Sequence, residues 1–171
     1  VSNTTGSYNT AIGRQALTFN TTGDNNTAMG SSALNANTTG VQNTASGMYA
    51  LYSNTTGNYN AATGYSSLYS NTTGSNNSIF GYKALYSNAT GRNNTAIGDS
   101  AGYNTAGNGN VYVGKRAGYY ETGSNKLYIG NDSNKTIIYG DVNTGQILLG
   151  RQQPNAYAFK GTRTLNVIGG V

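Results

Sequence analysis

Short apolar runs alternate with segments rich in Gly and Asn along most of this chain. Residues 9–13 read Asn-Thr-Ala-Ile-Gly, residues 94–98 repeat those letters, and residues 26–30 differ only by Met in place of Ile. An Ala-Leu pair follows soon after, as at 16–17 and 33–34. Because each run is bounded by Gly or Asn, the pattern predicts two strands of about four or five residues per unit and no helix.

The units repeat with a period of 17 residues. Asn-Thr-Thr-Gly opens the first five units and Asn-Ala-Thr-Gly the sixth, whereas the seventh, at Asn104, comes one residue early. A degenerate eighth unit places Gly123 and Gly130 where the seventh has Gly107 and Gly114. Three columns recur in phase and are expected to form structural ladders: Asn3, Asn20, Asn37, Asn54, Asn71 and Asn88; Gly6, Gly23, Gly40, Gly57, Gly74 and Gly91; and Leu17, Leu34, Leu51, Leu68 and Leu85.

A repeat of this length predicts an all-β fold in which each unit is one coil of a parallel β-solenoid, or β-roll. About seven to eight coils of 16–17 residues would stack along one axis, with neighbouring strands about 4.8 Å apart. Gly at fixed positions would supply the positive φ that tight corners need. Identical Asn and Thr side chains would lie above one another and hydrogen-bond along the axis.

The strands have apolar residues on both faces. In the run at 10–12, Ala11 points to one side, while Thr10 and Ile12 point to the other. A solenoid with one dry interior and one wet exterior does not need this, so we expect a homotrimer, intertwined or side by side, that covers the second face. The alternative is that the Ala columns only let the two sheets of a thin coil approach closely.

The chain divides into three parts by composition. Residues 1–104 form the regular solenoid and hold five charged residues, whereas the 67 residues after them hold ten. Residues 105–150 are expected to be degenerate coils and a closing β-module, since repeat arrays need caps. Residues 151–171 are expected to be a C-terminal strand or linker segment that is cut short; it ends in the strand-like run 165–168.

Composition excludes most catalytic chemistry. Asn, Gly and Thr account for 26, 25 and 23 of 171 residues, and there is no His or Cys. The commonest general base and the thiolate ligands are therefore missing, and we expect no enzyme, no cofactor and no metal site. The segment 132–134 (Asp-Ser-Asn) has oxygen ligands for Ca²⁺, but an Asx-turn is the preferred interpretation. No run of about 18 apolar residues exists, so no membrane insertion is expected. The acidic residues are scattered: Asp24, Asp99, Glu121, Asp132 and Asp141.

The net charge is +5, and most basic residues lie in the closing module. They are spread too thinly for a nucleic-acid site, so a solvated surface is expected, with attraction to acidic glycans as the alternative. A tyrosine column is a candidate ligand surface, because aromatic rows can stack on sugars, although stacked tyrosines also strengthen a parallel sheet. That column contains Tyr52, Tyr69, Tyr86 and Tyr103.

Rows of Thr raise a different function. Regular Thr arrays on a flat β-solenoid can order water and bind ice. Thr10, Thr27, Thr44 and Thr95 form such a row here, interrupted by Ala at 61 and Ser at 78. Ice binding is therefore the alternative function.

The Asn-Thr-Ala-Ile-Gly runs at 9–13 and 94–98, with their small-residue columns, resemble the head repeats of trimeric autotransporter adhesins. Those repeats are shorter and form left-handed parallel β-rolls in trimers. The stretches 125–133 and 138–141 are similar to a segment of phage tail-fibre-like proteins of the Bacteroidetes type. The resemblance implies a rigid structural and adhesive module of an extracellular fibre, located outside the cell or on a virion surface. It would display a surface for a cell-surface glycan or receptor, with no nucleic acid as partner.

Overall fold

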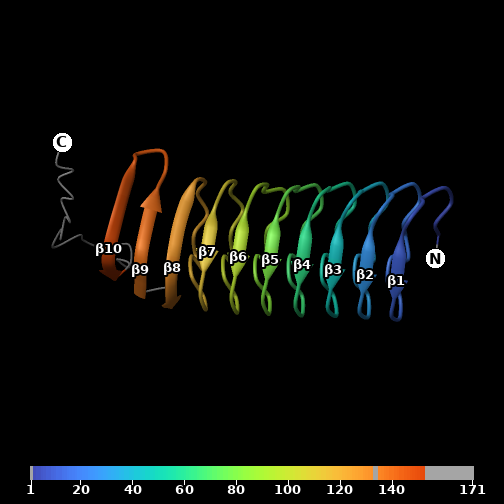
Figure 1. Cartoon of the computed structure of the whole chain (residues 1–171), viewed down its shortest axis with the longest axis horizontal. Coiled ribbons are helices and arrows are strands. Elements are labelled where there is room, and N and C mark those ends of the chain that lie inside the picture. Colours follow the sequence, from blue (N-terminus) through green and yellow to red (C-terminus); the bar gives the residue numbers. More distant parts are fainter. Residues whose placement is uncertain (1, 133–134, 153–171) are drawn as a thin grey trace.

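The computed structural model describes residues 2–132 and 135–152 as a single ten-stranded sheet, wound into a solenoid of about seven turns. The strands follow one another in the sheet in the order β1 to β10, so each coil lies beside its neighbours in the chain (Figure 1). No helix occurs in the described residues. The predicted parallel β-solenoid with coils of about 17 residues is therefore confirmed.

The first seven strands are three residues long. Each pairs in parallel with the next, and the register places identical columns side by side, as in Thr10↔Thr27 and Ala28↔Ala45. Their bounds are β1 (Thr10–Ile12), β2 (Thr27–Met29), β3 (Thr44–Ser46), β4 (Ala61–Thr63), β5 (Ser78–Phe80), β6 (Thr95–Ile97) and β7 (Val111–Val113).

The prediction of a second strand in each coil is wrong. The Ala-Leu pairs lie in turns, because residues on both sides of the Ala adopt a left-handed backbone: φ is 58° at Gln15 and 51° at Leu17. Non-Gly residues rarely adopt this conformation. The segment nevertheless bonds along the axis, since the Leu17 amide donates to the carbonyl of Ala33 at 3.0 Å.

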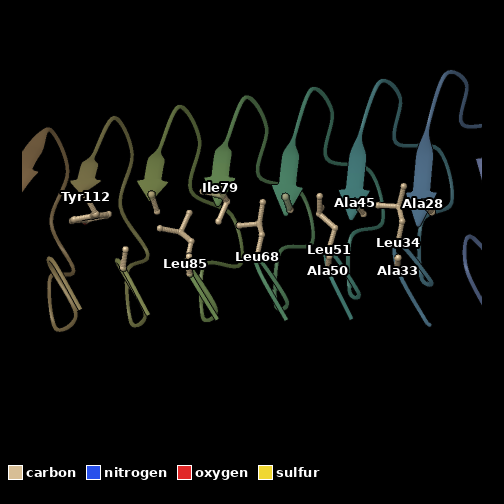
Figure 2. Packing of buried hydrophobic residues seen from close by; sticks show 14 of the residues in the cluster. Ala28, Ala33, Leu34, Ala45, Ala50, Leu51, Leu68, Ile79, Leu85 and Tyr112 are labelled. Carbon is tan, nitrogen blue, oxygen red and sulfur yellow. The ribbon is translucent and has the colours of Figure 1, made fainter. Parts of the chain in front are cut away.

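The leucine ladder forms the core. Leu17, Leu34, Leu51, Leu68 and Leu85 are all buried, with at most 2% exposed. They face the central residues of the strands, which are mostly Ala and include Ala28 and Ala45 (Figure 2). The small strand residue leaves room for the large turn residue, so each coil is thin and filled.

Near the end of the array, the turn position that holds Leu becomes small and the central strand position that holds Ala becomes large. The leucine column ends in Gly102 and Gly118, while the strand column gains Tyr112, which is fully buried. A Cβ on Gly102 would lie 2.5 Å from the Tyr112 ring, and one on Gly118 would lie 2.2 Å from it. The ring therefore fills the space that Leu occupies in earlier coils, and the core stays continuous.

The predicted asparagine ladder is a buried hydrogen-bonded file. The Nδ2 of Asn37 donates to the Oδ1 of Asn20 at 2.7 Å, and Asn54 and Asn71 continue the file at 2.8 Å each. Each Nδ2 also donates to the Gly carbonyl three residues later in its own coil, at 2.9 Å for Asn37. Except at Asn3, which is exposed, the ladder residues have 0% exposure.

A second asparagine ladder was missed by the sequence prediction. In this file each backbone N–H donates to the Oδ1 of the preceding coil, as from Asn60 to Asn43 at 3.0 Å. Each Nδ2 donates to a Gly carbonyl in the next coil, as from Asn60 to Gly74 at 2.9 Å. The members are Asn9, Asn26, Asn43, Asn60, Asn77, Asn94 and Asn110.

The Gly ladder that begins at Gly6 is explained by close approach between coils. A Cβ on Gly57 would lie 2.3 Å from the carbonyl oxygen of Gly74 and 2.4 Å from Oδ1 of Asn54. The predicted positive φ at fixed Gly positions is confirmed in a second Gly column, which begins with Gly13 at 128° and Gly30 at 134°. Both columns need Gly, but for different physical reasons.

The shortened coil departs from the expected alignment. Thr105, and not Asn104, occupies the next position of the asparagine ladder. The backbone N–H of Thr105 donates to the carbonyl of Gly102, just as the backbone N–H of Asn88 donates to the carbonyl of Leu85 one coil earlier. One residue, at 106, then takes the place of the two at 89–90. The period therefore shortens between Thr105 and Gly107.

Three longer strands close the sheet: β8 (Lys126–Asp132), β9 (Lys135–Asp141) and β10 (Gln146–Gln152). β8 still pairs in parallel with β7, but β8–β9 and β9–β10 are antiparallel. The strand-like run predicted at 165–168 lies outside the described residues, as does most of the segment 151–171.

Candidate functional site

The tyrosine row is a continuous stack on the outside of the turns. Ring centroids of successive tyrosines are 5.1, 5.0, 5.1 and 4.9 Å apart, with interplanar angles of 5–8°. The row runs through Tyr52, Tyr69, Tyr86 and Tyr103, and Tyr119 continues it beyond the predicted four. The repeat of the coils sets this spacing, because one ring is contributed by each coil.

The stacking decides what this row can offer a ligand. Tyr69 and Tyr86 each have a ring on both sides, so their faces are covered. The surface that remains consists of ring edges and hydroxyl groups. Burial and the neighbouring tyrosines raise the pKa of Tyr69, so its hydroxyl stays protonated at neutral pH. The row therefore presents hydrogen-bond donors at the repeat spacing, and not faces on which a sugar could stack.

Cations border the tyrosine row. The Lys83 ammonium lies 5.3 Å from the Tyr82 ring centroid and 5.8 Å from that of Tyr86. The Arg116 guanidinium lies 4.6 Å from the Tyr119 ring. A hydrogen bond to Tyr82 raises the pKa of Lys83, which keeps it charged. Aromatic edges beside fixed cations form a polar, positively charged strip along this side of the rod.

The outward face of the sheet has a second surface, which we call the outer row. It starts at the last residue of β1 and crosses all ten strands through register-paired positions. Eight of its ten members are apolar, and several are exposed, such as Phe80 at 62% and Ile97 at 45%. The row comprises Ile12, Met29, Ser46, Thr63, Phe80, Ile97, Val113, Ile129, Ile138 and Leu149. The apolar residues on this face are visible in the sequence of β1, whereas the extension of the row through the closing strands is shown by the strand register.

The Thr row lies on the same outward face, beside the outer row. Thr10, Thr27 and Thr44 are register-paired, after which Ala61 and Ser78 interrupt them as the sequence indicated. Bulky side chains of the outer row, such as Phe80, flank the Thr positions. An ice-binding face needs a flat regular array, and this geometry gives that function less support.

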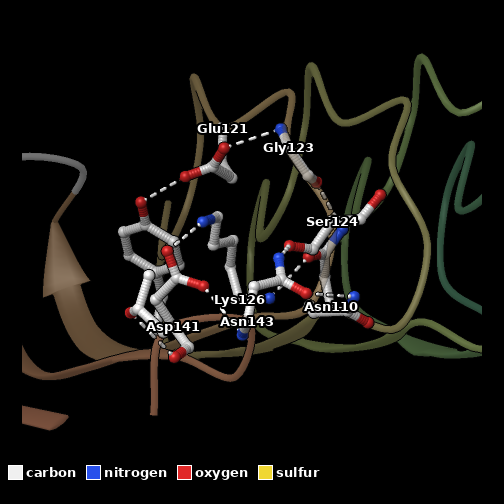
Figure 3. A network of polar contacts seen from close by, with 10 residues as sticks. Asn110, Glu121, Gly123, Ser124, Lys126, Asp141 and Asn143 are labelled. Carbon is white, nitrogen blue, oxygen red and sulfur yellow. Dashed lines mark hydrogen bonds and ion pairs between the residues drawn. The ribbon is translucent and has the colours of Figure 1, made fainter. Parts of the chain in front are cut away.

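A polar network holds the closing strands to the last coils (Figure 3). Lys126 forms an ion pair with Asp141 at 2.5 Å, and the backbone N–H of Asn143 donates to the same carboxylate at 3.0 Å. The carboxylate of Glu121 accepts from the Gly123 amide at 2.7 Å and from the Tyr128 hydroxyl. Lys126 lowers the pKa of Asp141, which keeps this pair charged. These contacts are internal to the protein and give a structural role to three charged residues of this region, Glu121, Lys126 and Asp141.

The acidic side chains do not gather into a metal-binding cluster in the part of the chain that the structure describes. Within residues 2–132 and 135–152 there is no cluster of three or more His, Cys, Asp or Glu side chains suited to a metal ion. Of the suggested calcium segment 132–134, only Asp132 is among the described residues. The same residues contain no helix with the length and apolar character needed to span a bilayer.

No family model, no curated protein and no solved structure matches this chain.

Proposed function

We propose that this protein is a structural and adhesive module of an extracellular fibre, such as a phage tail fibre or the head of a bacterial surface adhesin. The observation that carries the proposal is that stacked ladders of identical side chains fill the interior of the rod. Two buried asparagine ladders and a leucine ladder occupy it, so each coil is specialised for stacking on the next. Function is then left to the outer surface of a stiff rod.

A homotrimer is part of this proposal. The outer row supports it, because an apolar row with no charged member, running across the whole sheet, can pack against its own copies. Its ten positions span about 43 Å at the strand spacing of about 4.8 Å. The number of copies comes from the resemblance to trimeric adhesin heads.

A double substitution tests this interface. Phe80→Ser with Ile97→Ser removes two exposed apolar members of the outer row, so the mass in solution should fall to that of one chain. Tyr59→Ser is the control, since Tyr59 is 55% exposed but lies outside the row. An unchanged mass in the double variant would exclude the outer row as the interface.

The tyrosine row is the proposed receptor surface. Its hydroxyls repeat at the coil spacing, which suits a polymeric or clustered glycan with a regular array of hydroxyl groups. The paired variable positions at the corners, such as 41–42 and 58–59, extend the exposed surface that differs between coils. Localisation outside the cell or on a virion follows from this proposal.

A glycan array tests the receptor surface. The wild-type protein is expected to bind a subset of the glycans. The double variant Tyr69→Phe, Tyr86→Phe should lose that binding while it keeps its fold, because only the hydroxyls are removed and the ring stack remains. Binding that survives the loss of both hydroxyls would place the receptor surface elsewhere, and no binding by the wild type would count against adhesion.

A further inference from the structure

The shortened coil leaves a hollow on the surface of the rod. It has a volume of about 350 Å³ and draws its lining from three consecutive coils, including Thr73, Thr90 and Ala106. In regular corners one carbonyl, such as that of Thr38, accepts backbone N–H groups from three residues of the preceding coil. Ala106 stands where a regular corner has two residues, and its carbonyl accepts no backbone N–H from the residues that the structure describes. The hollow is therefore a consequence of the missing residue.

Backbone donors at this hollow have no acceptor. Among the described residues, no hydrogen bond is made by the N–H groups of Ala89 and Thr90, whose counterparts Thr55 and Thr56 donate to the carbonyl of Thr72 at 2.9 and 3.2 Å. The N–H of Ser75, which lines the hollow, is also unpaired among the described residues. Ser75 and Thr90 thus each bring an unpaired backbone N–H group to the lining of the hollow, and Ala89 directly precedes Thr90 in the chain.

Arg92 explains the third unpaired donor and adds a charge. In its column the side chain usually accepts an amide from the preceding coil, as Asn58 does from Val41 at 2.8 Å and Asn108 does from Arg92 at 2.9 Å. A guanidinium cannot accept, so the Ser75 amide loses its partner. Within the described part of the chain, the Arg92 guanidinium itself has no ion pair and no hydrogen bond. None of the described residues that line the hollow is acidic.

We propose that this hollow binds the anionic group of an acidic glycan, a carboxylate or a sulfate ester. Its lining offers the Arg92 guanidinium, the unpaired backbone N–H groups of Ser75 and Thr90, and the hydroxyls of Thr73 and Thr90. All of these are donors available to an oxyanion. The volume lies at the lower end of the range for small-molecule sites and suits one sugar unit with its charged substituent. A single cation rather than a row of them favours a glycan over a nucleic acid. The inference rests on the proposed adhesive function and names the kind of sugar that it would recognise.

Calorimetric titration with defined probes tests this site. The probes are a sulfated heparin-derived hexasaccharide, a trigalacturonate, the uncharged trigalactose and inorganic sulfate. The wild type should bind at least one acidic oligosaccharide and should bind trigalactose at least tenfold more weakly. Its affinity for the acidic oligosaccharide should fall as the salt concentration rises. Arg92→Gln should weaken the binding at least tenfold. Arg14→Gln is the matched control, because it removes the same charge from an exposed position far along the rod.

An insertion isolates the hollow from the charge. Adding one Thr between Ala106 and Gly107 restores the regular corner, keeps Arg92 and should abolish binding while circular dichroism stays unchanged. The inference is overturned if Arg14→Gln weakens binding as much as Arg92→Gln, if the insertion has no effect, or if inorganic sulfate binds as tightly as the oligosaccharides, which would indicate an adventitious ion only. Trimer mass and array binding through the tyrosine row are measured separately, so a failure here leaves the proposed function standing.

Discussion

The asparagine ladder allows the sharpest test of what holds the rod together, by the substitution Asn54→Ala. Asn54 is fully buried, and its Nδ2 donates to Oδ1 of Asn37 at 2.8 Å and to the carbonyl of Gly57 at 3.0 Å. Its Oδ1 accepts from Nδ2 of Asn71 at 2.8 Å. The substitution therefore breaks contacts to the coils on both sides as well as one within its own coil.

The cost follows from which groups keep a partner. The Gly57 carbonyl still accepts from Asn43, and Nδ2 of Asn71 still donates one hydrogen to Gly74. Oδ1 of Asn37 and the second hydrogen of Asn71 are left unpaired in the interior. A buried polar group without a partner costs about 1–3 kcal/mol, so the free energy of unfolding should fall by about 2–6 kcal/mol.

Urea unfolding followed by circular dichroism measures this loss, at one fixed protein concentration because an oligomer is stabilised by mass action. Asn3→Ala is the matched control: it is the same change in the same column, but Asn3 is exposed at the end of the ladder. It leaves one group, the Nδ2 of Asn20, short of a partner where Asn54→Ala leaves two, so it should cost about half as much. Equal effects of the two substitutions would refute the reasoning that burial makes the ladder stabilising.

Three further changes probe other parts of the fold. Gly57→Ala should destabilise by about 1–3 kcal/mol in urea titration, because its Cβ would meet the Gly74 carbonyl oxygen at 2.3 Å; a normal stability would show that the coils can separate there. Gln42→Gly relieves a φ of 56° at an exposed corner and should raise Tm by about 2–4 °C; a fall in Tm would mean that no strain is stored there. Lys126 lowers the pKa of Asp141 below its ordinary 3.8, so the pair stabilises above pH 4 and its contribution is lost as pH falls through the lowered pKa. The stability difference between wild type and Asp141→Asn should therefore shrink below pH 4, and a difference that persists to pH 2 would contradict this.

The coil and its ladders could be predicted because stacking needs repetition. A buried column is filled by the same residue type in each coil, so the period of 17 and the Asn54 and Leu51 columns are visible in the sequence. The second asparagine ladder recurs with the same period, but it was not predicted as a ladder. Its residues directly precede each short strand, where the pattern indicates a strand boundary. Its members are also invariant through the regular coils, as Asn43 and Asn60 illustrate.

The turn at the Ala-Leu pair, the ring orientation of the tyrosines and the hollow depend on three-dimensional geometry that the sequence pattern does not reveal. Leu51 has a φ of 51°, which propensity assigns to Gly, so the Ala-Leu pair was expected to be a strand. The tyrosine column was visible, but ring orientation was not, and orientation covers the ring faces of Tyr69. The hollow beside Arg92 could not be found because the sequence shows that a residue is missing, but not which corner loses its hydrogen bonds.

The mass of the protein in solution tests the central claim most directly, because a display rod of this class is proposed to be built from copies that cover each other's outer rows. Size-exclusion chromatography with light scattering on the wild-type chain should give three times 17.8 kDa, or about 53 kDa. That mass should persist on dilution to low micromolar concentration. A mass of 17.8 kDa at all concentrations would contradict the account, since the exposed apolar row would then face water on an isolated solenoid.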